Sequence, residues 1–209
     1  MASMTTRTYQ QRARAEEAER TRMRIIDAVF ERLREAPAEP IAIDRIARMA
    51  GVARSTVYAI FGSRAGLFDA VGRELGSRSG YETLVDAKHQ PDARDHLRSG
   101  IRAYGGMVAA SRDIYRALRS MAQLDEEAVG GAMKRIEEER ARGMARLAGR
   151  LAEQGVLRRG VGAKTAEHIL WMLTSFESYD SLYTGRGLSI ERTCELIIET
   201  AERALYAKP

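Results

Sequence analysis

Apolar residues recur every three or four positions along most of this chain, which is the period of an amphipathic α-helix. The first such face falls at about residues 21–35 and consists of Ile25, Ile26, Val29, Phe30 and Leu33. The segment APAEP (36–40) ends this helix, because proline cannot continue a helix interior. The same period predicts further helices at about 43–50, 54–60, 64–78, 92–111, 113–122, 125–154, 163–184 and 189–206. The pattern therefore predicts an all-α protein of about nine helices.

Polar and glycine-containing segments divide these helices into regions. Residues 1–20 are polar, and we expect them to be disordered or to form a frayed helical extension. Gly76, Gly80 and the polar stretch up to Pro91 indicate a looser region after the fourth helix. We therefore expect a flexible basic arm at 1–20, a small domain at 21–75 and a larger domain at 76–209.

Composition limits the kind of protein that this chain forms. Hydrophobic residues make up 44% and charged residues 30% of the 209 residues, so the chain should fold around its own core. No apolar run reaches the roughly 18 residues that a membrane span needs, and the N-terminus lacks the apolar segment of a signal peptide. Cys194 is the only cysteine, which excludes an intramolecular disulfide and suits a reducing compartment. These features predict a cytoplasmic protein.

The positive charge is concentrated at the N-terminal end of the chain. Residues 1–73 carry 13 arginines against 9 acidic residues, whereas residues 74–209 carry 21 basic and 20 acidic residues. From Arg45 to Phe68 there are four arginines and no acidic residue. A basic face is often only solvated, but it also suits an anionic partner, of which nucleic acid is the commonest.

The stretch DRIARMAGVARSTVYAIF (44–61) has the pattern of two short helices joined by a tight turn. Ala47 is small enough for the two backbones to approach, and Gly51 accepts the left-handed conformation that such a turn needs. Val57 would pack the second helix onto the first. An ordinary helical hairpin could show the same spacing. The favoured interpretation is a helix-turn-helix, in which the second helix enters the major groove of DNA.

Residues 21–75 resemble the N-terminal DNA-binding domain of the tetracycline-repressor (TetR) family of transcriptional regulators. The family pattern has Thr-aliphatic-Tyr-x-x-Phe in the recognition helix and Ser/Asn-Lys-x-x-Leu at the start of the fourth helix. The corresponding segments here are TVYAIF (56–61) and SRAGL (63–67). The resemblance implies an all-α fold, with an N-terminal three-helix helix-turn-helix domain and a larger helical domain for ligand binding and dimerisation.

The resemblance also implies which residues contact DNA. Arg54, Ser55 and Thr56 would face the bases, and Arg54 could bind a guanine bidentately. Tyr58 and Arg64 would contact phosphates. The alternatives are a half-buried packing residue for Tyr58 and a solvated residue at a helix start for Arg64.

Three positions depart from the family pattern. Ala42 stands where a Ser or Thr usually caps the second helix, Ala59 where an aromatic residue or His is common, and Arg64 where Lys is usual. These changes affect individual contacts rather than DNA binding as such. In the N-terminal arm, the basic residues are similar to arms that reach into neighbouring grooves, although a plain tail explains them equally well. These arm residues are Arg7, Arg12 and Arg14.

The resemblance to this family implies that the protein forms a homodimer and binds a two-fold symmetric operator in double-stranded DNA. The last two helices would form the dimer interface as a four-helix bundle. The candidate interface residues are Ile169, Leu173, Phe176, Ile190, Cys194, Ile197, Ala201 and Leu205. The same apolar residues could instead face the core of their own chain.

The resemblance further implies an effector pocket in the second domain. The candidate lining residues are Tyr104, Met107, Met121, Met144, Trp171, Met172 and Tyr179, chosen because Met and aromatic side chains adapt to ligands. Such residues are also ordinary core residues. The expected effector is a small apolar or aromatic molecule that relieves repression, with the fourth helix as the lever. A coupling free energy of about 1–3 kcal/mol would change operator affinity roughly 5–150-fold.

Catalysis is the competing class of function, and the sequence offers no constellation for it. No His-Glu-x-x-His or Walker-type glycine-rich loop occurs, and we expect no metal and no cofactor. His89, Asp92 and His96 could share a metal, but ordinary surface residues explain them better. Another alternative keeps the fold and makes the protein an architectural or partner-recruiting DNA-binding factor without a small-molecule ligand.

Overall fold

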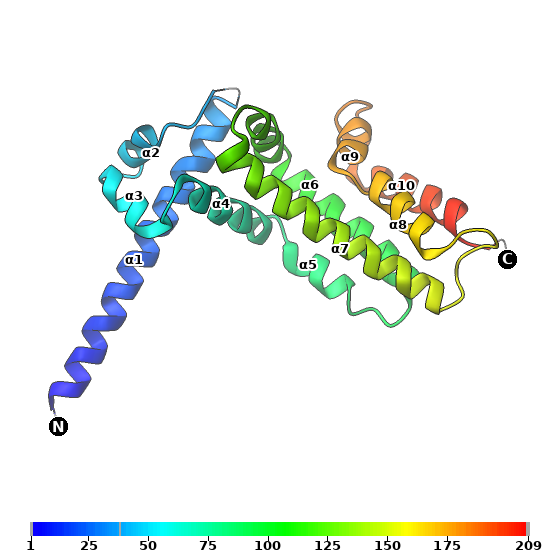
Figure 1. Ribbon diagram of the computed structural model, residues 1–209, viewed down its shortest axis with the longest axis horizontal. Coiled ribbons are helices and arrows are strands. Elements are labelled where there is room, and N and C mark those ends of the chain that lie inside the picture. Colours follow the sequence, from blue (N-terminus) through cyan, green and yellow to red (C-terminus); the bar gives the residue numbers. More distant parts are fainter. Residues whose placement is uncertain (1, 38, 208–209) are drawn as a thin grey trace. The chain divides into compact units, whose positions relative to one another are not determined.

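The computed structural model describes residues 2–37 and 39–207, with side chains described from Gln11 onward. Extended pairing in this part of the chain is limited to an isolated bridge between Leu157 and Tyr206, so the all-α prediction is confirmed. The elements, shown in Figure 1, are α1 (Ala2–Glu35), α2 (Ile43–Met49), α3 (Arg54–Phe61), α4 (Arg64–Arg78), α5 (Tyr81–Ala87), α6 (Ala93–Leu124), a short π-helical turn η1 (Glu126–Gly130), α7 (Gly131–Glu153), α8 (Ala163–Leu173), α9 (Phe176–Tyr183) and α10 (Ile190–Leu205). None of the described helices is both long and apolar enough to cross a membrane.

The chain divides into two compact units. The first unit comprises Met1–Glu74 and Asp113–Met133, and the second comprises Leu75–Arg112 and Lys134–Pro209. One division falls between Glu74 and Leu75, and the domain bounds expected from the sequence, 1–20, 21–75 and 76–209, stay predictions. The sequence did not indicate that Asp113–Met133 belongs with the N-terminal helices, because its apolar period looks the same whichever unit it packs in. The functions assigned to the two domains stay predictions.

Two predicted helices are one continuous helix in the structure. The sequence pattern predicts one helix at 92–111 and another at 113–122, with a break at Arg112, but α6 runs unbroken from Ala93 to Leu124. The Ser111 hydroxyl donates to the carbonyl of Met107 at 2.7 Å, one helical turn back. A polar residue whose hydroxyl is satisfied in this way does not end a helix.

Two other boundaries also differ from the prediction. The pattern at 163–184 is interrupted at Thr174 and Ser175, which separate α8 from α9. The Thr174 hydroxyl donates back to Leu170 at 2.7 Å, and the Ser175 side chain accepts the backbone N–H of Ser178 as the N-cap of α9. The N-cap at Ser175 satisfies a free backbone N–H at the start of a helix and therefore accounts for the new start at Phe176. The bond of Thr174, like that of Ser111, is compatible with a continuous helix. The region after Gly80, which was expected to be loose, contains the short helix α5. Its seven residues make only about two turns, which is too short for a recognisable spacing of apolar residues.

The core of the first unit forms around the C-terminal half of α1. All five apolar residues predicted for this face are at most 2% exposed, which confirms the period over Ile25, Ile26, Val29, Phe30 and Leu33. Ile46 of α2, Val57 of α3 and Phe68 of α4 are buried with them, each 2% exposed or less. The helix-turn-helix segment is therefore anchored by its apolar residues, which leaves its polar side chains at the surface.

The core of the second unit includes close packing of α6, α9 and α10. The Tyr179 hydroxyl of α9 donates to the carbonyl of Ile101 in α6 at 3.0 Å, and its ring meets that of Tyr104 edge-on, with centroids 5.2 Å apart. Burial raises the pKa of Tyr179 well above its ordinary value, so the phenol stays a neutral donor. A Cβ on Gly105 would lie under 3.0 Å from the Cys194 sulfur of α10, so the absence of a side chain at Gly105 allows this approach.

Arg150 of α7 holds the segment between α5 and α6 in place. Its guanidinium donates to the backbone carbonyls of Lys88 and Pro91 at 3.1 and 2.9 Å. It also donates to Nδ1 of His96 at 2.9 Å, so His96 acts as a neutral acceptor. Burial, followed by the charges of Arg150, Lys88 and Arg146, lowers the pKa of His96 to about 4.

The free energy of unfolding is expected to fall as the pH drops from about 6.5 toward 4, because of His96. The unfolded chain takes up a proton on this ring below about pH 6.5, whereas the folded chain does so only near pH 4, so acid favours unfolding in that window. After allowance for partial exposure of the ring, we expect a loss of about 1 kcal/mol between about pH 7 and 5.5. Urea unfolding at the two pH values measures it. The His96→Gln variant, which keeps an acceptor, should show a smaller loss; an equal loss in both proteins would assign the pH dependence to other groups.

Candidate nucleic-acid interface

A tight turn sets the angle between α2 and α3. Gly51 has φ of 65°, in the left-handed region that glycine adopts without strain. The backbone N–H of Val52 donates to the carbonyl of Ala47 at 2.9 Å, which fixes the chain as it leaves α2. Ala47 is 3% exposed, so its small side chain lies where the helices approach. The roles predicted for Ala47 and Gly51 are confirmed.

The two faces of α3 differ as the sequence predicted. Val57 is 2% exposed and faces the core, whereas Arg54, Ser55 and Tyr58 are exposed. Thr56 is half-buried. α3 therefore presents a guanidinium, a hydroxyl and a phenol on its outer side, a set of side chains that can donate to base edges or phosphates. None of these contacts is tested by the fold alone, and the assignment of the five residues to DNA stays a prediction.

Arg54 is held by weak surface interactions. Its guanidinium pairs with Asp44 at the start of α2 at 3.0 Å and lies 5.6 Å from the ring centroid of Tyr58. A side-chain hydrogen bond with Tyr58, followed by the charge of Asp44, raises the pKa of Arg54. The side chains of Arg54 and Asp44 are 59% and 60% exposed, and a pair this exposed is weak because water screens it. Arg54 can therefore leave this pair for a base at little cost.

The junction between α3 and α4 is tighter than the sequence indicated. The backbone N–H of Gly66 donates to the Ser63 hydroxyl at 3.0 Å, so Ser63 caps the start of α4. A Cβ at Gly66 would lie under 3.0 Å from the carbonyl oxygen of Phe61, the last residue of α3. Gly66 falls at an unspecified position of the Ser/Asn-Lys-x-x-Leu pattern, and nothing in the local sequence shows that another backbone passes there.

Arg64 makes contacts inside the first unit that the sequence did not predict. Its guanidinium donates to the carbonyl of Ile41 at 3.0 Å, stacks over Phe68 and forms an ion pair with Asp125. Asp125 in turn caps η1 by accepting the backbone N–H of Ala128 at 3.1 Å. The side chain of Arg64 is 32% exposed, so it is not the freely solvated residue of the alternative interpretation. Its predicted phosphate contact would have to replace the pair with Asp125.

The N-terminal arm continues α1 as a helix back to Ala2. Arg12 and Arg14 are exposed on it. The side chain of Arg7 lies outside the described residues.

The residues predicted for an effector pocket do not gather in one place. Tyr104 and Tyr179 pack together, and Met121 is buried in the first unit rather than the second. Met172 is 61% exposed and Trp171 36% exposed, with the guanidinium of Arg140 stacked 3.4 Å from the Trp171 ring centroid. Met107 and Met144 are half-buried. Selecting residues because they are Met or aromatic identified apolar side chains, but these side chains do not line one common cavity.

The predicted dimer interface stays a prediction, and most of its residues are covered within their own chain. Five of the eight residues are at most 5% exposed in the single chain, so they have almost no surface left for a partner: Phe176, Cys194, Ile197, Ala201 and Leu205. On α10 this apolar face packs within the second unit, where Cys194 lies 3.7 Å from the carbonyl oxygen of Ile101. Ile169, Leu173 and Ile190 are half-buried. The spacing of apolar residues along a helix shows which of its faces is buried. It does not show which other helix or chain covers that face.

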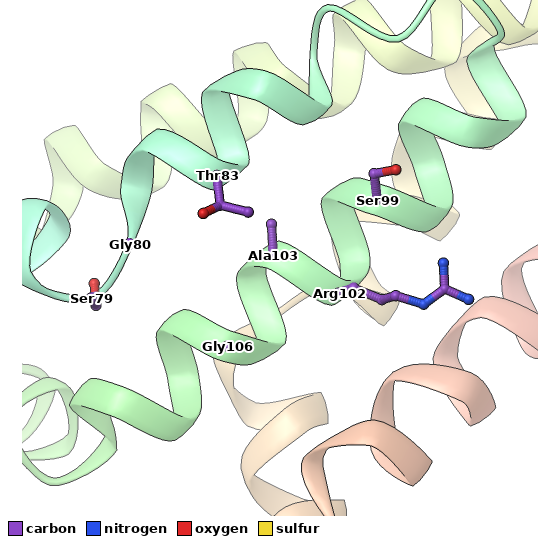
Figure 2. Close-up of a pocket in the computed structure, with 7 residues that line it drawn as sticks. All are labelled: Ser79, Gly80, Thr83, Ser99, Arg102, Ala103 and Gly106. Atoms are coloured by element: carbon purple, nitrogen blue, oxygen red, sulfur yellow. The ribbon is translucent and has the colours of Figure 1, made fainter.

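A shallow cavity of about 510 Å³ lies in the second unit, between α6 and the segment that joins α4 to α5. Small and hydroxyl-bearing residues dominate its lining, which consists of Ser79, Gly80, Thr83, Ser99, Arg102, Ala103 and Gly106. Figure 2 shows Thr83 of α5 and Ala103 of α6 facing one another, while the Arg102 guanidinium extends away from Thr83. None of the seven predicted pocket residues lines this cavity.

The described side chains give no support to a metal site. No group of three His, Cys, Asp or Glu residues among them is arranged to hold a metal ion. Cys194 is buried, and burial raises the pKa of its thiol to about 11, so the residue behaves as a core thiol.

Comparisons with known proteins bear on the N-terminal part of the chain. Residues 25–71, from α1 into α4, match the family model described as bacterial regulatory proteins, tetR family. The HTH-type transcriptional regulator SrpR of Pseudomonas putida is 34% identical over 112 residues, which cover 46% of this chain and 52% of SrpR. The chain thus spans about half the length of this curated relative.

Solved structures resemble most of the chain. NalD of Pseudomonas aeruginosa, the secondary repressor of the MexAB-OprM multidrug efflux pump, superposes with a TM-score of 0.69 at 22% identity, covering 92% of this chain and 98% of NalD. The ketosteroid transcriptional regulator KstR2 of Mycobacterium tuberculosis has a TM-score of 0.64 at 13% identity, covering 90% and 95%. At these identities the likeness concerns the fold. It confirms the all-α architecture with an N-terminal helix-turn-helix domain.

Proposed function

We propose that this chain, which belongs to the tetR family of bacterial regulatory proteins, is a sequence-specific DNA-binding transcriptional repressor. The observation that carries the proposal is the α2–turn–α3 segment, which lies inside the matched residues 25–71. Its apolar residues are buried and its Arg54, Ser55 and Tyr58 side chains are exposed on one helix. Family membership supports a regulator rather than an enzyme.

In this proposal α3 enters the major groove and α2 crosses the backbone. Arg54 leaves Asp44 to bind a guanine bidentately, and Ser55 and Tyr58 add contacts to neighbouring bases or phosphates. The absence of acidic residues between Arg45 and Phe68 supports this orientation, because an acid there would repel phosphates. The protein would act in the bacterial cytoplasm, where the chromosome lies.

Two copies of the chain would bind a two-fold symmetric operator. Since most of the predicted dimer interface is buried within the single chain, two copies need another apolar surface in order to associate. The exposed side of α8 supplies one: Met172 is 61% exposed, and Ile169 and Leu173, three positions before it and next to it, are half-buried. We assign the dimer contact to this part of α8.

A small effector would release the protein from its operator. NalD, which shares the fold, is the secondary repressor of a multidrug efflux pump, and this supports a repressor role here. The cavity between α5 and α6, at about 510 Å³, is within the size range of small-molecule sites. The Ser79 hydroxyl already donates to the carbonyls of Leu75 and Gly76, which leaves the hydroxyls of Thr83 and Ser99 for a ligand on a lining surface that is mostly apolar. This lining is compatible with the small apolar or aromatic effector expected from the sequence. The coupling needed for a regulatory response is about 1–3 kcal/mol.

Selection from randomised duplexes with the purified protein is expected to yield a two-fold symmetric site, and Arg54→Ala should relax the preference at one base pair of each half-site. A bidentate contact contributes about 1–3 kcal/mol of discrimination between bases, so the preference should drop roughly 5- to 150-fold. Competition for binding between duplexes that differ at this one base pair measures the preference. Arg203→Ala in α10 is the control, because it removes the same charge from a side chain 80% exposed outside the helix-turn-helix, and it should keep the preference. A wild-type protein that prefers no duplex over random DNA would refute the proposal.

A further inference from the structure

Folding brings one carboxylate against the basic segment that contains α3. No acidic residue occurs from Arg45 to Phe68, yet Asp125, far along the chain, forms an ion pair with Arg64 at the start of α4. Both residues belong to the first unit. Their side chains are 32% exposed for Arg64 and 19% for Asp125, so water and salt screen this pair less than they screen the pair of Arg54 with Asp44.

The two oxygens of Asp125 have different partners. Oδ1 accepts the backbone N–H of Ala128 at 3.1 Å and so caps η1, whereas Oδ2 faces the Arg64 guanidinium. α4 begins at Arg64, and the N-terminal end of a helix carries a partial positive charge, so a cation there is stabilised by a carboxylate beside it. The cap therefore fixes the carboxylate, and the carboxylate holds the arginine.

The nitrogens of Arg64 are divided in the same way. Nη2 donates to the carbonyl of Ile41 at 3.0 Å, two residues before α2 begins, and Nη1 faces Asp125. The guanidinium also stacks over Phe68, with its carbon 5.6 Å from the ring centroid. Nη1 can therefore exchange one anion for another while Nη2 stays on Ile41, without any movement of the backbone.

The position of this guanidinium suits a contact with the DNA backbone. Only Gly62 and Ser63 separate α3 from α4, so Arg64 follows directly on the helix that enters the groove in the proposed function. Its bond to Ile41 places it at the start of α2, the helix that crosses the DNA backbone. Arginine binds carboxylates and phosphates in the same geometry, so a phosphate can take the place of Asp125.

We propose that Asp125 is an autoinhibitory group, which holds Arg64 in the free protein and is exchanged for a backbone phosphate when the operator binds. The exchange lowers operator affinity, because Asp125 loses its partner when the phosphate takes Arg64. It also removes Arg64 from the salt dependence of binding, since the freed carboxylate takes up a cation as the phosphate releases one. This inference rests on the proposed function of α3.

Asp125→Asn tests the exchange. Asn is as good an N-cap as Asp, so η1 keeps its cap while the charge that holds Arg64 is removed. Operator affinity at about 0.1 M salt should rise roughly eightfold per protomer, and its salt dependence should become steeper by about 0.9 per protomer. Asp125→Ser, which keeps a capping oxygen without the charge, should give the same gain.

Glu127→Gln is the matched control. It removes the same charge from an exposed residue of η1 that forms no ion pair with Arg64, so it should change affinity and salt dependence much less. In an Arg64→Ala background, Asp125→Asn should give no larger gain than Glu127→Gln. Urea unfolding of each variant checks that the fold is kept.

Three results would overturn the proposal while leaving the function of α3 intact. The first is a folded Asp125→Asn or Asp125→Ser protein with unchanged or lower operator affinity. The second is a gain in Glu127→Gln as large as that in Asp125→Asn, and the third is a full gain that persists without the Arg64 side chain. A wild-type protein without operator preference would refute the proposed function instead.

Discussion

The Gly66→Ala variant is expected to lose about 3 kcal/mol of the free energy of unfolding and, with it, operator binding at physiological temperature. The added Cβ would lie under 3.0 Å from the Phe61 carbonyl oxygen. That atom belongs to the backbone at the end of α3, so no side-chain rotation relieves the overlap. α4 or the end of α3 must shift, and the shift falls on the helix that presents Arg54 and Tyr58.

Gly76→Ala, in the same helix, is the matched control. A Cβ there would meet only the Tyr81 Cβ at 3.8 Å, an ordinary contact, so the change should be neutral or stabilising by about 0.5–1 kcal/mol. Denaturant unfolding followed by circular dichroism compares the two variants. If Gly66→Ala were as stable as Gly76→Ala, the close approach of α3 and α4 would not exist in solution.

Gly105→Ala is expected to destabilise the second unit by about 2–3 kcal/mol. Its Cβ would lie under 3.0 Å from the Cys194 sulfur and 3.4 Å from the Tyr179 ring, in the packed region between α6, α9 and α10. Cys194→Ala alone should also destabilise, by about 1 kcal/mol, because it removes a buried group. The double variant should be more stable than Gly105→Ala, because the methyl group at 105 then occupies the space of the missing sulfur.

Gly106→Ala provides the adjacent control for this pair. No atom lies within 4 Å of a Cβ at this exposed position, so the substitution should stabilise α6 by about 0.5–1 kcal/mol. Thermal unfolding of the four variants and the wild type gives the coupling free energy between positions 105 and 194. Additive effects of Gly105→Ala and Cys194→Ala would contradict the predicted overlap.

The candidate interface was predictable because its determinants are local. Ala47, Gly51 and Val57 lie within eleven residues of one another, and the left-handed φ of Gly51 depends only on the turn between two short helices. The sequence therefore predicted the tight turn before α3, its buried Val57 and most of its exposed polar residues, whereas Thr56, also expected to face outward, is half-buried. It did not predict the internal contacts of Arg64, because Asp125 lies 61 positions further along the chain.

By itself, the sequence determined the all-α class, the helix-turn-helix and, to within one residue, the bounds of α2, α3, α4 and α10, since these follow from period, turn residues and capping within a few positions. The tertiary structure decided which surface covers each apolar face. It buried Cys194 and Leu205 of α10 within their own chain, placed Met172 at the surface, and required glycine at positions 66 and 105. A helical period records only that one side of a helix avoids water. The partner of that side depends on contacts between residues far apart in the chain, and these exist only once the chain has folded.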